Sequence, residues 1–442
     1  MGTVLPFPQA LEKRDQSGHP RVLLLQGPVG PFFARLQKAL NTEGWEAWRV
    51  AFHAGDALFA GNDRARRVDF PGSPDAWEGW LSALLDRGSV DAMVAFGPER
   101  PPHAIARRVA AAHGVPVLCL EAGYIRPGFI TAEWGGNNAA SPLAGRLPPP
   151  GWAPAGPPPD EARDFHRTPW MATWASLYYI AREARSTQVQ RALFHRATPL
   201  LAEAAGWARN ALRRSALWTH DTRRVADLAS GRAGPYTLLP LQVPQDANLG
   251  APALGWTSPR LIASAITALA AHGPPDHRLV FKVHPMARGH STEPALIRST
   301  ARALGVEDRV EILETGPLGP LARGAAAMVT VNSTSGLSAL HHGTPIVALG
   351  RALYTHPALV TCTQGAEPDW PSAFTGRVPV ADAALRRRYI AWIREEALIP
   401  GDLYAPLGVG IAIRGVAERL SSLSAKKMTS MSAPQMGAGR EP

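Results

Sequence analysis

The sequence predicts an α/β protein made of two doubly wound domains with a helical insertion between them. First, short uninterrupted apolar runs alternate with amphipathic helical stretches in both halves, as in parallel sheets that are covered on both faces. Second, the 442 residues suffice for two domains with separate cores. Third, a stretch rich in Pro, Gly and Ala (Pro142–Pro159) and a helical block separate the two α/β series.

In the first series, an apolar strand begins at Arg21 and ends in a glycine-containing turn, after which the helical period starts at Phe32. The second series begins at Pro235 with the same alternation. Two such halves facing a cleft form a GT-B-like arrangement of Rossmann-like domains, with the ligand outside the carboxyl ends of the strands. The predicted strands are 21–26, 46–52, 92–96, 115–120, 236–241, 277–283, 310–313, 327–331 and 346–349, and the helices are 32–41, 104–113, 258–271, 293–304 and 383–396.

Composition and pattern also predict the domain boundaries. We expect the two ends of the chain to be tails that lack the apolar content to fold. The expected parts are a disordered tail (1–20), a Rossmann-like domain (21–150), a basic helical block (151–232), a second Rossmann-like domain (233–380), C-terminal helices (381–425) and a disordered tail (426–442).

Composition excludes several classes of protein. The two cysteines, Cys119 and Cys362, lie in apolar strand-like contexts, so we expect no disulfide framework and a cytoplasmic protein. No apolar stretch is long enough for a transmembrane helix or a signal peptide. The net charge is +10, and Arg182–Arg224 carries nine arginines against three acids. This basic block is either a solvated helical face or a surface for anionic membranes; nucleic acid is not expected, because no binding motif accompanies the charge.

Two motifs in the second half predict a phosphate site. Val329–Gly350 is expected to be a strand, a polar turn, a short helix and a second strand. Backbone N–H groups and hydroxyls at such a helix N-terminus bind phosphate, although an ordinary N-cap is the alternative for the Ser-Thr pair. Upstream, Leu279–Pro285 is a strand that ends in a His-Pro pair. The candidate nucleotide-sugar residues are Lys282, His284, Pro285, Asn332, Ser333, Thr334 and Gly336.

Carboxylates follow the expected end of one strand in each half of the chain. Glu121 follows the strand 115–120, and Asp246 follows the first strand of the second half. Two carboxylates on opposite walls of a cleft suit glycosyl chemistry, although a salt bridge to Arg126 is the alternative for Glu121. The weaker candidates for sugar or acceptor binding are Gln26, Gly27, Gly30, Tyr124, Arg126 and Gln242.

Together these motifs resemble the KpsS (LipB) capsule polysaccharide family. The resemblance spans roughly residues 21 to 360. It is carried by Gln26-Gly-Pro-x-Gly-Pro-Phe-Phe, Glu121-Ala-Gly-Tyr-x-Arg-Pro, Pro240-Leu-Gln-x-x-x-Asp246, Lys282-x-His-Pro, Asn332-Ser-Thr-x-Gly-Leu-Ser-Ala and Leu349-Gly-Arg-Ala-x-Tyr354.

The resemblance implies a retaining β-Kdo glycosyltransferase that transfers Kdo from CMP-Kdo to a lyso-phosphatidylglycerol acceptor. It implies Asp246 as nucleophile and Glu121 as acid/base, with His284 and Ser333-Thr334 on the CMP phosphate, as similar motifs act in bacterial sialyltransferases. The first domain would face the acceptor and the second the nucleotide sugar. The expected location is the cytoplasmic face of the inner membrane, with an anionic phospholipid and other capsule assembly proteins as partners.

We expect no cofactor beyond the donor substrate and no metal. A CMP-sugar already carries its leaving group, and the sequence has no Asp-x-Asp or His-Cys cluster. Lys282 and His284 could instead stabilise the departing phosphate. Two alternatives stay open, namely a CDP-glycerol-type phosphotransferase and a non-catalytic capsule export component.

Overall fold

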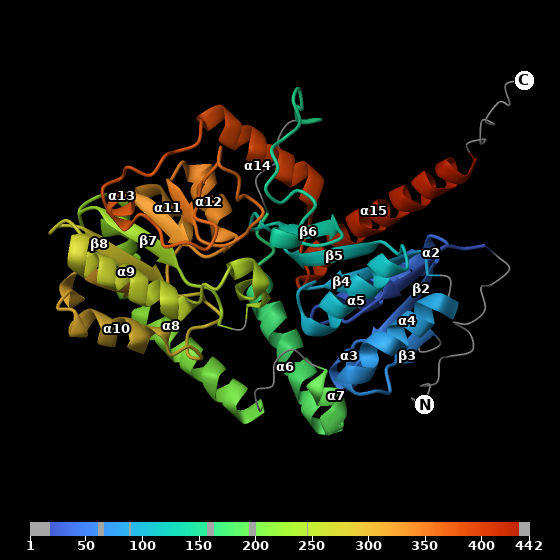
Figure 1. The fold of residues 1–442 in the computed structure, drawn as a ribbon. Coiled ribbons are helices and arrows are strands. Elements are labelled where there is room, and N and C mark those ends of the chain that lie inside the picture. Colours follow the sequence, from blue (N-terminus) through green and yellow to red (C-terminus); the bar gives the residue numbers. More distant parts are fainter. Residues whose placement is uncertain are drawn as a thin grey trace, which may run out of the picture. The chain divides into compact units, whose positions relative to one another are not determined.

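The chain folds into two compact units, each assembled from separate segments (Figure 1). Unit 1 comprises Met1–Trp134, Glu161–Ala197 and Ile399–Pro442, and unit 2 comprises Gly135–Asp160 and Thr198–Leu398. The computed structural model describes residues 18–60, 66–87, 90–156, 163–193, 200–244 and 246–432.

Unit 1 contains a seven-stranded sheet in the order β13-β6-β5-β4-β1-β2-β3. The pairs from β3 to β5 are parallel, whereas β6 runs antiparallel to β5. This parallel part has the Rossmann strand order, which changes direction between β1 and β4. The strands are β1 (Arg21–Leu24), β2 (Glu46–Ala51), β3 (Arg67–Asp69), β4 (Ala92–Phe96), β5 (Val117–Ala122), β6 (Phe129–Trp134) and β13 (Leu398–Pro400).

Helices cover both faces of this sheet. Val22 of β1 belongs to a core shared with α2 and α15, and its neighbour Leu23 belongs to a core shared with α4 and α5. Successive strand residues point to opposite faces, so both must be apolar, which explains the uninterrupted apolar runs. The helices are α2 (Phe32–Thr42), α3 (Ala54–Leu58), α4 (Trp77–Arg87), α5 (Pro101–Ala112), α6 (Arg167–Arg185), α7 (Gln188–Ala192) and α15 (Pro406–Ser432).

Unit 2 contains a six-stranded sheet in the order β12-β11-β10-β7-β8-β9, in which every pair is parallel. The chain moves outward from β7 to β9 and then returns to β10 on the other side of β7. The strands are β7 (Tyr236–Pro240), β8 (Arg278–Lys282), β9 (Val310–Leu313), β10 (Ala327–Thr330), β11 (Ile346–Ala348) and β12 (Thr361–Cys362). The helices are α8 (Leu200–Ala229), α9 (Ser258–His272), α10 (Glu293–Ala303), α11 (Leu318–Gly324), α12 (Ser335–His342), α13 (Trp370–Phe374) and α14 (Ala383–Ala397).

The α/β class with parallel sheets is confirmed, whereas the observed units differ from the expected boundaries. The helical block 151–232 is divided, because α6 and α7 belong to unit 1 and α8 to unit 2. The C-terminal helices are divided as well, since α14 belongs to unit 2 and α15 to unit 1. The physical reason for the second division is that Val409 and Leu420 of α15 are fully buried in the core with α2.

The chain ends differ in part from the expected tails. α15 continues to Ser432, within the range expected to be a tail, whereas residues 1–17 and 433–442 lie outside the described part. None of the helices in the described part of the chain is long and apolar enough to cross a membrane.

Candidate functional site

The strand order of unit 2 brings two of the sequence motifs together. Gln242 follows β7 and Asn332 follows β10, and these strands are neighbours at the point where the chain reverses direction. The backbone N–H of Asn332 donates to Gln242 Oε1 at 3.4 Å, and Gln242 Nε2 donates to Asp246 Oδ2 at 3.0 Å. Ligands of parallel α/β sheets bind at this type of position. We call Gln242, Asp246, Asn248, Asn332 and Asn138 the switch-point cluster.

The Asp246 carboxylate is held in a fixed orientation within this cluster. Its Oδ2 accepts from Gln242, and its Oδ1 accepts from the backbone N–H and Nδ2 of Asn248, at 3.0 and 2.9 Å. The residue is half-buried, so it remains partly accessible to a ligand. A carboxylate that is oriented by three donors is suited to attack or to stabilise a developing positive charge.

Two asparagines that the sequence analysis did not select complete the cluster. Asn138 Nδ2 donates to the Asn332 carbonyl and to Asn248 Oδ1, both at 3.2 Å, and Asn138 Oδ1 accepts from the N–H of Leu353 at 3.0 Å. Asn138 has a φ of +51°, a conformation that asparagine adopts more readily than most residues. These contacts span up to 215 positions in the sequence, so no local pattern reveals them.

Asn332 contributes a buried acceptor to the cluster. Its Nδ2 donates to the Asn248 carbonyl at 2.6 Å, and its side chain is fully buried. In the described part of the chain, Asn332 Oδ1 has no hydrogen-bond partner. A buried acceptor without a partner costs roughly 1–3 kcal/mol, and such atoms are uncommon in folded proteins.

The Ser-Thr turn lies directly after Asn332 at the start of α12. Ser333 Oγ accepts from Ser335 Oγ at 2.8 Å, and Tyr354 OH donates to the Ser333 carbonyl at 2.7 Å. Thr334 is the N-cap residue, but its side chain makes no capping hydrogen bond. The Thr334 side chain therefore does not cap α12, whereas Ser333 Oγ accepts from the N–H of Ser335, the first residue of the helix, at 3.3 Å.

Gly336 is required by packing against Tyr354. A Cβ atom at Gly336 would lie 2.2 Å from Tyr354 Cζ, far inside van der Waals contact. The absence of a side chain thus lets the Tyr354 ring lie against α12 and hold the Ser333 carbonyl. Tyr354 belongs to the sixth sequence motif, although we did not predict it as a site residue.

The end of β8 places a buried cation and a histidine beside β7. Lys282 is buried, and its Nζ donates to the Val283 carbonyl at 3.3 Å. Burial and, secondarily, the nearby Arg288 lower the pKa of Lys282 to about 8. His284 Nδ1 accepts from the N–H of Met286 at 3.2 Å, so the neutral ring carries its proton on Nε2 and can donate from that atom.

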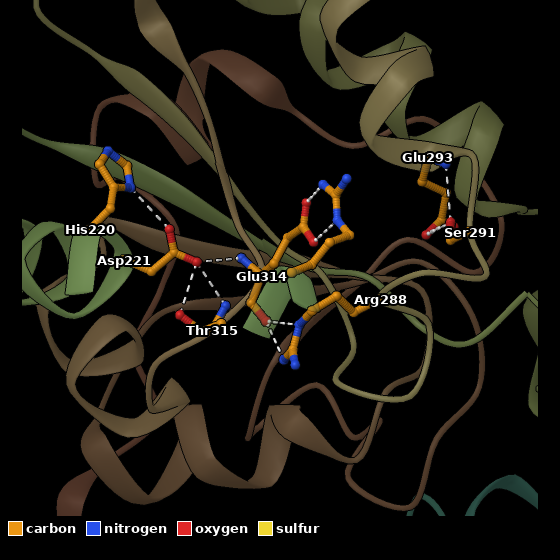
Figure 2. Close-up of polar contacts among 8 residues, drawn as sticks. His220, Asp221, Arg288, Ser291, Glu293, Glu314 and Thr315 are labelled. Carbon is orange, nitrogen blue, oxygen red and sulfur yellow. Dashed lines mark hydrogen bonds and ion pairs between the residues drawn. The ribbon is translucent and has the colours of Figure 1, made fainter. Parts of the chain in front are cut away.

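A polar network holds the loop after β9, the strand that pairs with β8 (Figure 2). Asp221 of α8 accepts from the N–H groups of Glu314 and Thr315, at 2.9 and 2.8 Å, and from the Thr315 hydroxyl. Arg213 Nε donates to the Glu314 carboxylate at 2.8 Å. Arg288 Nε donates to the Glu314 carbonyl at 3.0 Å. The network therefore fixes the loop after β9 and holds Arg288 near Lys282.

In unit 1, the first predicted motif has a packing role. Gln26 is buried, and its Nε2 donates to Asp56 Oδ2 at 3.1 Å, which also accepts from the backbone of Phe52. A Cβ atom at Gly27 would lie 2.8 Å from the Phe33 ring. Gly30 has a φ of +106°, and its Cβ would lie 2.9 Å from the Trp174 ring. These packing contacts are enough to explain why glycine occupies both positions, and no bound ligand is needed for the explanation.

The second motif of unit 1 follows the edge of the parallel part of the sheet. Glu121 lies within β5 rather than after it, half-buried and opposite Thr131 of β6. Tyr124 is buried, and its hydroxyl donates to Glu133 Oε2 at 2.5 Å. Arg126 lines a cavity and donates from Nε to the Gly123 carbonyl at 2.8 Å.

The charged groups around Arg126 include Glu121, its predicted salt-bridge partner. Desolvation and, secondarily, the positive charge of Arg167 lower the pKa of Arg126 to about 10, and Glu121 opposes this change by a smaller amount. Glu121 therefore lies within electrostatic range of Arg126, and the salt bridge between them stays a prediction. The two predicted carboxylates lie in different units, Glu121 in unit 1 and Asp246 in unit 2.

Comparison with known proteins assigns the family. Residues 91–404 match the family described as "Capsule polysaccharide biosynthesis protein". The chain belongs to this family. The capsule polysaccharide modification protein LipB of Neisseria meningitidis serogroup B is 32% identical over 346 residues, covering 76% of this chain and 82% of LipB. The capsule polysaccharide export protein KpsS of Escherichia coli is 32% identical over 335 residues, covering 76% and 85% of the two chains.

Solved structures match this capsule polysaccharide biosynthesis protein at low similarity. Thermosulfurimonas dismutans KpsC, a beta Kdo 2,7 transferase, matches with a TM-score of 0.40 and 12% identity, over 91% of this chain and 99% of KpsC. A UDP-N-acetylglucosamine 2-epimerase from Listeria monocytogenes matches with a TM-score of 0.36 and 14% identity, over 96% and 100%. The family predicted from the sequence motifs is confirmed.

Proposed function

We propose that this protein is a glycosyltransferase that transfers Kdo from CMP-Kdo to a lyso-phosphatidylglycerol acceptor. The observation that carries the proposal is the switch-point cluster, where Gln242 and Asn248 orient the Asp246 carboxylate and the N–H of Asn332, next to the Ser-Thr turn, donates to Gln242. The names of LipB and KpsS, which refer to capsule polysaccharide modification and export, agree with a role in capsule assembly.

The donor phosphate would be bound by groups at the ends of β8 and β10. Lys282 supplies positive charge, and His284 Nε2 is oriented as a donor by the contact of Nδ1 with Met286. The Ser333 hydroxyl would add a further donor, whereas the first N–H groups of α12 already donate to Ser333 Oγ and to the carbonyls of Ser333 and Thr334. Charge at this position would stabilise the phosphate as it leaves.

The chemical role of Asp246 would be nucleophilic. Its carboxylate would form a bond to the anomeric carbon of Kdo while the bond from that carbon to the phosphate oxygen breaks, so that CMP leaves with the electron pair. The acceptor hydroxyl oxygen would then attack the same carbon, with Glu121 taking its proton, and the carboxylate of Asp246 would be released. Two displacements retain the configuration.

A mass-spectrometric assay tests this function against its alternatives. The purified chain is incubated with a lyso-phosphatidylglycerol analogue and either CMP-Kdo or CDP-glycerol. We expect the acceptor mass to increase by one Kdo residue with CMP-Kdo alone. An increase by glycerol phosphate with CDP-glycerol would favour the phosphotransferase, and no product with any nucleotide-activated donor would favour the non-catalytic export component.

Membrane association would depend on the exposed face of α8. Part of the predicted basic block is engaged, because Arg213 pairs with Glu314 and Arg224 pairs with Glu311. Arg214 and Arg223 are exposed on α8, and so are Leu201, Leu212 and Trp218. Exposed apolar side chains next to arginines suit the surface of an anionic bilayer.

Co-sedimentation with phosphatidylglycerol vesicles tests this surface. We expect binding that falls as salt rises and that is weakened by Arg214→Gln with Arg223→Gln, because each basic residue near an anionic membrane contributes roughly 1 kcal/mol. The matched control replaces Arg298 and Arg302, which are exposed on α10 of the same unit. Equal loss in both double variants, or equal binding to neutral vesicles, would refute a specific role for α8.

A further inference from the structure

A cavity within unit 1 has no role in the donor site. It lies between the loop before β6, the start of α6 and the loop before α15, and its volume is about 420 Å³. This volume falls in the range of ~300–1,000 Å³ that is typical of small-molecule sites. The polar residues that line it are Arg126, Asp164, His166, Arg167, Thr168 and Asp402.

The two arginines of this cavity have unused donors. Arg126 uses Nε to hold the Gly123 carbonyl. Among the residues that the structure describes, the Nη atoms of Arg126 and the entire Arg167 guanidinium have no hydrogen-bond partner. Arg167 also lowers the pKa of Arg126, so the two cations are close enough to repel each other. An anion between them would relieve this repulsion and accept several charge-assisted hydrogen bonds.

The start of α6 adds to the positive character of the cavity. This helix is 19 residues long and begins at Arg167, and its N-cap residue His166 has a φ of +49° and makes no side-chain capping hydrogen bond. The first N–H groups of α6 are therefore not capped by a side chain, and the helix dipole places partial positive charge beside the two guanidinium groups.

The two carboxylates of the cavity already have hydrogen-bond donors. Asp164 Oδ1 accepts from the N–H of His166 at 2.8 Å. Asp402 is buried, and its Oδ1 accepts from the N–H groups of Tyr404 and Ala405, at 2.7 and 2.8 Å. The carboxylates therefore do not occupy the Nη donors of Arg126 or the guanidinium of Arg167, which stay available to a ligand.

We infer that this cavity binds the phosphate group of a phosphate ester through Arg126, Arg167 and the N-terminus of α6. Resting on the proposed function, the ester is the glycerophosphate headgroup of the acceptor, because unit 1 is the predicted acceptor domain. The cavity is larger than one phosphate ion and has room for an attached glycerol.

Calorimetric titration of the full chain tests the cavity without any turnover. The probes are sn-glycerol 3-phosphate, inorganic phosphate and a short-chain lyso-phosphatidylglycerol, with glycerol as the neutral control. We expect Arg126→Met and Arg167→Met each to weaken binding of the phosphate-bearing probes by about tenfold or more, and the corresponding Lys variants to lose less. The matched control is Arg185→Met, at the exposed far end of the same helix.

The possible results distinguish a failure of the phosphate-binding proposal from a failure of the proposed Kdo transfer. Unchanged phosphate affinity in folded Arg167→Met, or glycerol binding as tight as glycerol phosphate binding, overturns the cavity even if Kdo transfer occurs. Arginine-dependent binding in a chain that transfers no sugar supports the cavity and overturns the function. Tighter binding of the lipid than of glycerol phosphate assigns the lipid headgroup, and equal binding assigns a free phosphate ester.

Discussion

Lys282 is a buried cation whose charge changes near physiological pH. Its pKa of about 8 lies below the ordinary value of 10.5, since burial disfavours the charged form. The folded protein therefore releases this proton more easily than the unfolded chain does. The charged form lowers stability below pH 8, and this cost disappears as the pH rises from 8 towards 10.5.

The same titration predicts the pH dependence of donor binding. The affinity for CMP should fall as the pH rises above 8, by up to about tenfold per pH unit, because phosphate binds the protonated amine. Lys282→Arg keeps its charge and should flatten this dependence. Calorimetric titrations with CMP from pH 7 to 9.5 measure both profiles. Identical profiles in the wild type and Lys282→Arg would exclude Lys282 as the titrating group.

At the scale of single residues, the sequence predicts which positions are constrained more readily than it predicts the contact that constrains them. Gln26, Gly27 and Gly30 stay candidates for contact with sugar or acceptor, and in the structure they contact Asp56, Phe33 and Trp174. A glycine that admits an aromatic ring has the same sequence signature as one that admits a ligand. The role of Gly30 depends on the residue that contacts it, and that residue, Trp174, lies far away in the sequence.

At the scale of elements, the position of α12 depends on its contact with Tyr354. Gly336→Ala would place a methyl group 2.2 Å from Tyr354 Cζ, so the ring or the helix must move. We expect a loss of about 1–3 kcal/mol in the free energy of unfolding of unit 2, together with weaker CMP binding as the Ser333 turn shifts. Denaturant unfolding and calorimetry measure the two effects.

Gly79→Ala provides the matched control for this substitution. Gly79 is exposed on α4, and a Cβ atom there would meet nothing within 4 Å. In an exposed helix the change should stabilise by up to about 1 kcal/mol. A Gly336→Ala variant that is as stable as Gly79→Ala would show that the contact with Tyr354 does not constrain α12.

The elements that could be predicted are those with a local signal. Parallel strands buried on both faces appear as apolar runs, which is why β7, β8 and β10 were expected close to their observed positions. β6 was missed because Thr131 and Glu133 interrupt its apolar pattern, although both are buried by tertiary contacts. The burial of Glu133 depends on Tyr124, a partner that no periodicity reveals.

At the scale of the whole molecule, the segments that build each unit are far apart in the sequence. Arg35 of α2 donates to the Pro406 carbonyl at the start of α15, across 371 positions. From the sequence alone, the C-terminal helices are therefore predicted as a separate part. The switch-point cluster was predicted in part, because Gln242, Asp246 and Asn332 belong to local motifs, whereas Asn138 is contributed by the segment before the helical block.

The central claim is that the oriented Asp246 carboxylate is the nucleophile for sugar transfer. Asp246→Asn keeps the size and most hydrogen bonds of the side chain but removes its charge. The variant should therefore bind CMP-Kdo within about threefold of the wild type while losing at least ~100-fold in transfer rate. Asp276→Asn, at an exposed carboxylate of the same unit, is the matched control and should retain activity.

The decisive measurement is the rate of Kdo transfer to the lyso-phosphatidylglycerol analogue by Asp246→Asn, followed by mass spectrometry, with donor binding measured on the same sample. We expect normal donor binding and almost no product. Kdo transfer at a rate near that of the wild type would exclude Asp246 as the nucleophile.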